Sequence, residues 1–186
     1  MLLFGLFAAS AGAFAASVLF HLPRFAAAPT VLFGLAGVTA SAFIYLVPAR
    51  PAWNSAHTVV DFHLTGLLTG AAFLSALGAG VPAWIVAALA AAQLLNQAAR
   101  LLRLALSDEF ELLASARLIS QDLRRVFHLR LGLLILGGIA LTLTGHARLA
   151  FPLILAGEFA GRWLFFVSVV PRNMALPWLS QGGRAA

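Results

Sequence analysis

Glu158 and Arg162 are the two side chains best suited to chemistry in this sequence, because both interrupt a long apolar run. Their four-residue spacing places them on one face of a helix. A lone charge at the centre of a bilayer raises the insertion free energy by about 2.5–3.5 kcal/mol. Two interpretations follow: a polar lining for a proton path or a quinone headgroup, or an internal ion pair that fixes helix packing.

Histidine is the other residue type that could bind a cofactor, and the sequence has five: His21, His57, His63, His128 and His146. Haem ligation by a helical bundle needs two histidines at matching depth on facing helices. None of the five lies in the middle of a predicted span. We therefore expect structural or interfacial histidines and no cofactor bound by this chain.

Other reactive side chains are missing from the sequence. Cysteine and lysine do not occur, which excludes disulfides, thiolate metal sites, iron–sulfur ligation and Schiff-base chemistry by this chain. We find no nucleophile-plus-base motif, no phosphate loop and no clustered set of metal ligands. The sequence therefore predicts no catalytic residues and no metal site, and it favours a non-catalytic subunit over a self-sufficient enzyme.

Composition indicates which elements must position these residues. Apolar residues make up 62% of the chain and charged residues 10%, against about 45–50% and about 25% in soluble domains. A bilayer solvates so much apolar surface, whereas one soluble core could not hide it. The net charge of +6 is then interpreted as membrane topology, with lipid and not nucleic acid as the partner.

Apolar runs of about 20 residues are long enough to cross a bilayer. Six candidates occur, at about 1–20, 28–47, 61–77, 82–100, 129–143 and 149–170, with proline or glycine at most junctions. The predicted fold is all-α, a multi-pass transmembrane helical bundle of about six spans. Residues 1–186 form a single membrane domain.

The only long polar stretch connects the fourth and fifth predicted spans, at about 103–128. Apolar residues recur there at three- and four-residue steps, at Leu112, Ala116, Ile119, Leu123 and Val126. This spacing predicts an amphipathic helix on the membrane surface, capped by Ser107. It serves either as a connector or as a docking site for a soluble partner.

Arginines divide unevenly between the two predicted membrane sides. Nine fall on the side of both termini: Arg50, Arg100, Arg103, Arg117, Arg124, Arg125, Arg130, Arg172 and Arg184. Arg24 and Arg148 fall on the other side. Because cytoplasmic loops carry the excess of basic residues, both termini are predicted to be cytoplasmic.

Two stretches carry a family resemblance. The first is GVTASAFIY at 37–45 with VPARPAWN at 47–54, and the second is GEFAGRWLFFVSVVPRNM at 157–174. Both resemble the membrane anchor subunits of dimethyl sulfoxide reductase, and the likeness covers essentially the whole chain. Typical anchors of that family have eight spans, so the first two are expected to be missing here. The family's quinol-linked histidine belongs to that missing part, and its role is not transferred to His21.

The resemblance implies a role in anaerobic respiration at the bacterial inner membrane. In the family, a haem-free anchor tethers an iron–sulfur subunit and a molybdopterin catalytic subunit and binds menaquinol, whose electrons pass on to them. Glu158 and Arg162 are then candidates for the quinol site or a proton path. The alternative is a small membrane transporter or a structural membrane protein with Glu158 and Arg162 as its polar core.

Overall fold

The computed structural model describes residues 2–21 and 26–172, and most of these residues are helical. Its elements are α1 (Leu2–Leu19), α2 (Ala27–Phe43), α3 (Ala56–Ala76), α4 (Ala83–Ala105), α5 (Phe110–Arg117), a π-helical turn (Leu118–Asp122), α6 (Arg124–Leu133), a second π-helical stretch (Leu134–Leu141) and α7 (Ala147–Val167). The described residues contain no strand, which confirms the all-α prediction. The chain divides into two compact units, Met1–Ile44 and Tyr45–Ala186.

The first unit contains α1 and α2. Aromatic rings of α1 lie against small residues of α2: a Cβ added at Gly34 would lie 3.2 Å from the ring of Phe7, and one at Gly37 would lie 3.6 Å from Phe4. Most of the other apolar side chains in α1 are exposed. The two helices therefore pack along a narrow contact.

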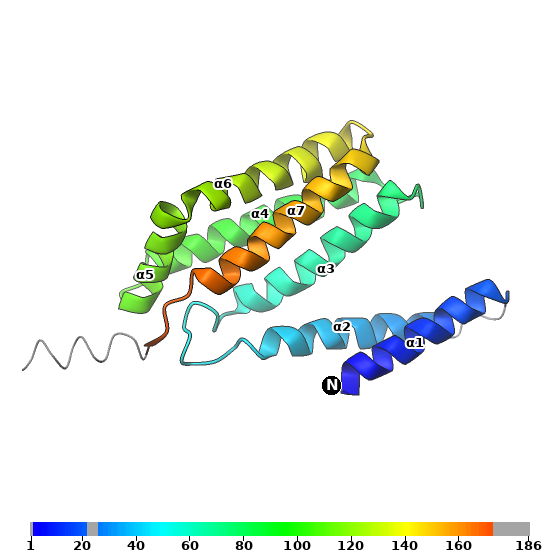
Figure 1. Ribbon diagram of the computed structural model, residues 1–186, viewed down its shortest axis with the longest axis horizontal. Coiled ribbons are helices and arrows are strands. Elements are labelled where there is room, and N and C mark those ends of the chain that lie inside the picture. The colour runs from blue at the N-terminus through cyan, green and yellow to red at the C-terminus, as the bar shows by residue number, and fades with distance from the viewer. Residues whose placement is uncertain (1, 22–25, 173–186) are drawn as a thin grey trace, which may run out of the picture. The chain divides into compact units, whose positions relative to one another are not determined.

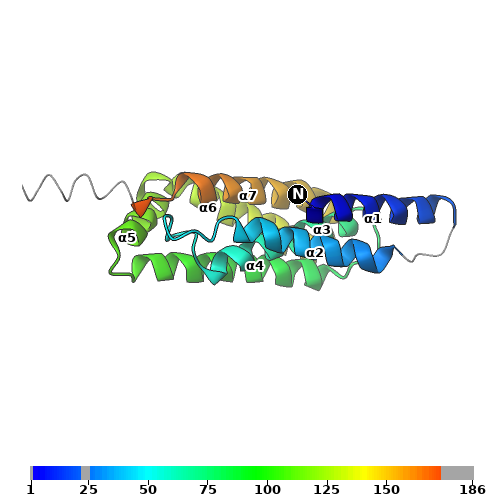
Figure 2. The ribbon, with the colours of Figure 1, turned by 90° about the horizontal axis from the view of Figure 1, so that it is seen from below.

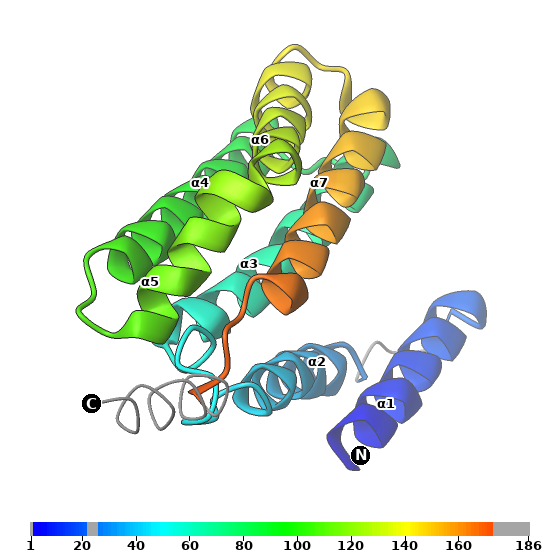
Figure 3. The same ribbon diagram turned by 60° about the vertical axis from the view of Figure 1, so that its left-hand side comes forward.

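The second unit is a bundle of four long helical segments, namely α3, α4, α6 with the π-helical stretch after it, and α7 (Figure 1). The α3–α4 connection and the connection into α7 lie at one end of this bundle (Figure 3). Helix α5 lies at the other end, beyond the end of α4 (Figure 2). The apolar core of the four-segment bundle consists of Leu68, Ala72, Val86, Ala90, Leu134, Ala150 and Ile154.

The π-helical stretch lets α6 approach its neighbours closely. A Cβ at Gly138 would lie 2.5 Å from the Cβ of Ala90 on α4, and one at Gly137 would lie 2.8 Å from the Cβ of Leu153 on α7. Membrane helices often pack through small residues of this kind. Because lipid provides no hydrophobic driving force for helices to associate, they depend on close van der Waals contact. Gly137 and Gly138 therefore fix the spacing of three helices.

Within residues 2–21 and 26–172, four helices, α1, α3, α4 and α7, are long and apolar enough to cross a membrane. Helix α2 is apolar but has 17 residues, fewer than the roughly 20 that a straight span needs. The fifth predicted span corresponds to α6 and the π-helical stretch, whose first turns carry charged residues. The number of six spans, like the single domain, stays a prediction.

The polar connection is folded against the second unit. Leu112, Ala116 and Ile119 are buried and form a second small core with Ala52 and Leu104, so the predicted apolar face is confirmed as far as Ile119. One continuous helix is wrong, because the chain passes from α5 through a π-helical turn into α6. The capping prediction is also wrong in position: the Ser107 hydroxyl accepts a hydrogen bond from the Glu109 N–H at 3.1 Å, but Glu109 is the N-cap residue of α5.

Candidate functional site

Polar side chains from all four long segments of the second unit meet in its interior. The cluster consists of Asp61 and Thr65 from α3, Gln93 and Gln97 from α4, Arg130 from α6, and Glu158 and Arg162 from α7. Arg130 is 2% exposed and Glu158 is 4% exposed. We call these seven residues the polar cluster.

Both carboxylates of the polar cluster accept hydrogen bonds from neutral donors. Gln93 Nε2 and Gln97 Nε2 donate to Asp61 Oδ1 at 2.9 and 2.7 Å. Thr65 Oγ1 donates to Glu158 Oε2 at 2.6 Å, and Gln93 Nε2 lies 3.3 Å from the same oxygen. Because a buried carboxylate is costly unless it is hydrogen-bonded and paired, these donors stabilise the charged groups in the bundle.

The charged partners of the two carboxylates come from other helices. Arg130 Nη2 lies 3.6 Å from Asp61 Oδ1 and 3.8 Å from Glu158 Oε2. Arg162 Nη1 lies 3.8 Å from Asp61 Oδ2, and its guanidinium lies over the ring of Phe62, 3.8 Å from the ring centre. Arg130 and Asp61 therefore each bridge two charged groups.

The internal pair between Glu158 and Arg162 is therefore wrong as a direct contact: each residue pairs across helices instead. Gly161 explains the outcome. A Cβ at Gly161 would overlap the guanidinium carbon of Arg130, so the missing side chain opens the space through which Arg130 reaches Glu158. Arg162, the next residue along α7, pairs with Asp61 and lies over the ring of Phe62.

Helix α3 has two glycines four residues apart, Gly66 and Gly70, and α7 has a similar pair, Gly157 and Gly161. The two pairs have different surroundings. A Cβ at Gly157 would lie 3.3 Å from Leu133 and Leu134, whereas one at Gly66 or Gly70 would meet nothing within 4 Å. Close packing at a Gly-x-x-x-Gly pair is thus found on α7, where α6 lies against it.

An aromatic group lies next to the polar cluster. The indole of Trp53 stacks on Phe165 with ring centres 5.1 Å apart, and its Nε1 donates to the backbone carbonyl of Phe165 at 2.8 Å. Tyr45 meets both rings edge-on, each at 5.3 Å. The two stretches that carry the family resemblance, more than 100 residues apart, therefore meet here; Asn173 and Met174 lie outside the described residues.

The histidines occupy separate places. His57 Nδ1 lies 2.9 Å from Asn96 Oδ1, and His63 Nδ1 lies 2.9 Å from the carbonyl of Val59. Helix α3 begins at Ala56, five residues before the predicted span, so His63 lies two turns inside it. His63 therefore lies deeper in its helix than the predicted span 61–77 placed it. Among residues 2–21 and 26–172, no three His, Asp or Glu side chains gather as metal ligands.

Sequence reasoning missed most of the polar cluster. The sequence predicts Asp61 at the start of a span and Arg130 at the membrane side that carries both termini. A usable signal was the spacing of Gln93, Gln97 and Arg100, which places three polar side chains on one face of an apolar helix. A polar stripe inside an apolar helix predicts a buried contact with a polar stripe on another helix.

Chemically, the polar cluster can hold a proton. Glu158 Oε1 and Gln93 Oε1 are buried and make no hydrogen bond with the described residues. A carboxylate with one unoccupied oxygen can take up a proton there, and Gln93 Oε1 can accept a hydrogen bond. Ionisable residues buried within membrane helices commonly mark proton or substrate pathways.

Fold and site together define an all-α helical bundle that buries charged groups and whose long apolar helices are compatible with a membrane protein. No family model, curated protein or solved structure matches this chain. The resemblance to an anchor subunit therefore stays a prediction, and function is argued from the chain's own residues.

Proposed function

We propose that this chain is the membrane anchor subunit of a molybdopterin-containing oxidoreductase similar to dimethyl sulfoxide reductase. It tethers an iron–sulfur subunit and a catalytic subunit and helps to pass electrons from menaquinol in anaerobic respiration. Within this role, Glu158 and Arg162 belong to a polar cluster that takes up or releases the protons that accompany quinol oxidation. The chain itself performs no substrate chemistry.

One observation carries the proposal: the two stretches with the family resemblance converge on one site. Trp53 from the first stretch bonds to Phe165 in the second. Glu158 and Arg162, also in the second stretch, form cross-helix ion pairs. If the resemblance of the two distant segments were due to chance, they would have no reason to contact each other. Segments that form one structural and functional unit are expected to be in contact.

Co-purification tests the proposal. The full chain, carrying a C-terminal affinity tag, is extracted from its native membrane in a mild detergent and purified. We expect an iron–sulfur protein and a molybdenum protein to elute with it, and both to become soluble when the chain is deleted. Purification of the chain alone, with a molybdenum enzyme held to the membrane by another subunit, would contradict the proposal.

We propose a location in the bacterial inner membrane with both termini cytoplasmic. Arg50, Arg103, Arg117, Arg124, Arg125 and Arg172 lie on segments at the end of the second unit where α3 begins and α7 ends, whereas Arg148 begins α7 at the other end. Arg100 and Arg130 are buried and do not contribute to the surface bias. Arg24 and Arg184 lie outside the described residues. The basic end is expected in the cytoplasm.

Single cysteines test this topology, since the chain has none of its own. Thr144→Cys and Gln121→Cys place exposed thiols at opposite ends of the second unit. In intact cells, an impermeant maleimide should label Thr144→Cys and spare Gln121→Cys until the cells are lysed. The reverse pattern would overturn the proposed orientation.

A second function, a small transporter, is favoured by one observation: the polar cluster joins all four long segments of the second unit. Intramembrane charges often line ion or proton routes. Proteoliposomes containing the purified chain alone would distinguish the functions. A transporter moves protons or solute without the soluble subunits, whereas an anchor does not.

A further inference from the structure

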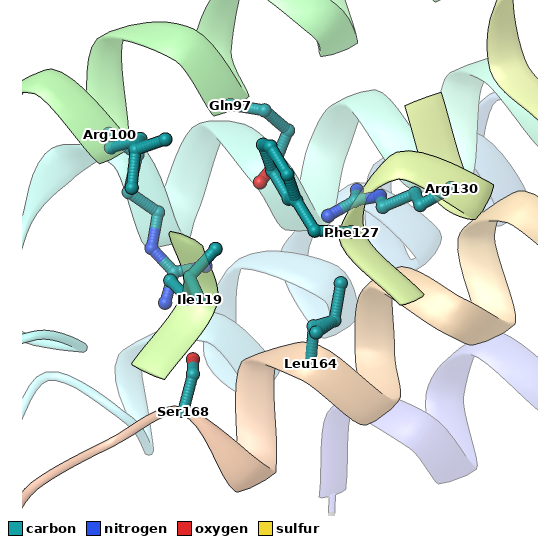
Figure 4. A pocket seen from close by; sticks show the side chains of 8 residues that line it. Gln97, Arg100, Ile119, Phe127, Arg130, Leu164 and Ser168 are labelled. Atoms are coloured by element: carbon teal, nitrogen blue, oxygen red, sulfur yellow. The ribbon is translucent and has the colours of Figure 1, made fainter. Parts of the chain in front are cut away.

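A small cavity at the basic end of the second unit borders the polar cluster and shares Gln97 and Arg130 with it. Its volume is about 10 Å³, and it is lined by Gln97, Arg100, Leu101, Ile119, Phe127, Arg130, Leu164 and Ser168. In Figure 4, Arg100 extends from α4 toward Ile119 and Ser168, whereas Arg130 extends from α6 toward Phe127. A space of this size holds about one water-sized particle, which is too small for a quinol ring.

The cavity is lined by buried groups that need acceptors. Arg100 is 5% exposed and Ser168 is 1% exposed. Arg100 Nε and Nη2, Arg130 Nε and the Ser168 hydroxyl find no hydrogen-bond partner among the described residues, and neither does Arg130 Nη2, which faces Asp61 and Glu158 in its ion pairs. Four of these five atoms are guanidinium nitrogens, which only donate. The lining therefore favours a ligand that accepts hydrogen bonds.

Charge balance selects an anion over water. Arg100 and Arg130 are buried and Arg162 is partly exposed, and together they carry three positive charges against two negative charges on the buried Asp61 and Glu158. The chain has six acidic residues, and the other four, Asp108, Glu109, Glu111 and Asp122, belong to the connection at the bundle end. Both carboxylates form their ion pairs with Arg130 and Arg162, so Arg100 is a buried charge without a carboxylate partner among the described residues, and its guanidinium contacts the ring of Phe165 at 5.3 Å.

We propose that this cavity binds one small monovalent anion of halide size, held by the Arg100 guanidinium and the Ser168 hydroxyl, with Arg130 adding attraction. The anion neutralises the surplus charge and stabilises the end of the bundle where α4, α6 and α7 meet. The anion site does not rest on the proposed electron-transfer role, although it shares Arg130 with the polar cluster. A water molecule could satisfy the same donors but would leave the charge unbalanced.

The test is a halide titration of the full chain, purified with any bound subunits in halide-free detergent solution. Sodium chloride or bromide replaces sodium gluconate at constant ionic strength, and the thermal unfolding temperature is followed. We expect a saturable rise, with the folded-to-unfolded ratio increasing about elevenfold at ten times Kd. Arg100→Gln should abolish this rise in unfolding temperature, and Ser168→Ala should raise the Kd for halide about tenfold. The exposed control Arg125→Gln should show the same rise as the wild type.

Direct binding removes the dependence on folding of any variant. Broadening of the ³⁵Cl resonance by the wild-type protein should be relieved by bromide and should be reduced in Ser168→Ala. Equal stability in chloride and gluconate would overturn the proposal. So would an unchanged halide response in both Arg100→Gln and Ser168→Ala, because the effect would then be general screening of surface charge.

Discussion

The two compact units use similar apolar helices in different ways. In Met1–Ile44, rings of α1 contact glycines of α2, this part of the sequence contains no acidic residue, and its single arginine is Arg24. In Tyr45–Ala186, four long segments enclose two carboxylates and their arginines. Because lipid solvates apolar side chains as well as a neighbouring helix does, apolar contact alone specifies little. Buried charge is what ties particular helices together in the second unit.

The largest effect should come from removing Arg130, which serves both carboxylates. Arg130→Met strands Asp61 and Glu158 in the bundle, and breaking a buried pair in this way costs about 3–5 kcal/mol. We expect little folded protein, measured as the monodisperse fraction extracted from membranes. The exposed control Arg125→Met should be extracted normally. Normal yield of Arg130→Met would mean that the second unit does not depend on its buried charges.

Gly161→Ala should have an intermediate effect. The added Cβ would overlap the guanidinium of Arg130, and such overpacking typically costs about 1–3 kcal/mol. Gly66→Ala is the matched control, because a Cβ there meets nothing within 4 Å and glycine within a helix is less stable than alanine by about 0.5–1 kcal/mol. Thermal unfolding in detergent should show opposite signs for the two variants. Equal shifts would show that Arg130 moves aside without cost.

The smallest effect is expected in the first unit. Leu32 on α2 is 65% exposed, so Leu32→Val should change stability by less than about 0.5 kcal/mol. Leu134→Val, at a fully buried position of the second unit's core, should be more harmful, in the range of about 0.5–1.5 kcal/mol for loss of one methylene. Comparable losses for both, by the same unfolding assay, would remove the contrast between the units.

The sequence predicts features that lie along one helix better than it predicts contacts between two helices. Apolar runs separated by proline and glycine predict where the long helices lie. The charged residues Glu158 and Arg162 correctly predict that α7 contributes to a polar interior. Their partners could not be predicted in the same way. Spacing along one helix puts Glu158 beside Arg162, but the structure has Arg130 entering at Gly161 from a segment that looks like a polar connection.

The start of α3 shows the same limit. The apolar run predicts Asp61 and His63 at the edge of a span, but the helix begins at Ala56. Asp61 is therefore inside the bundle and accepts hydrogen bonds from Gln93 and Gln97 on α4. Hydropathy averages along one helix and carries no information about a partner on another helix. Matching polar stripes between helices would have been needed.

Double-mutant cycles test most directly the central claim that charge pairs run between helices and not along α7. Asp61→Asn, Glu158→Gln and Arg162→Gln are combined pairwise, and unfolding free energies are measured in one detergent. The account predicts a coupling of about 0.5–3 kcal/mol between Asp61 and Arg162, as for residues in contact, and a clearly smaller coupling between Glu158 and Arg162. A larger coupling for Glu158 with Arg162 than for Asp61 with Arg162 would contradict it.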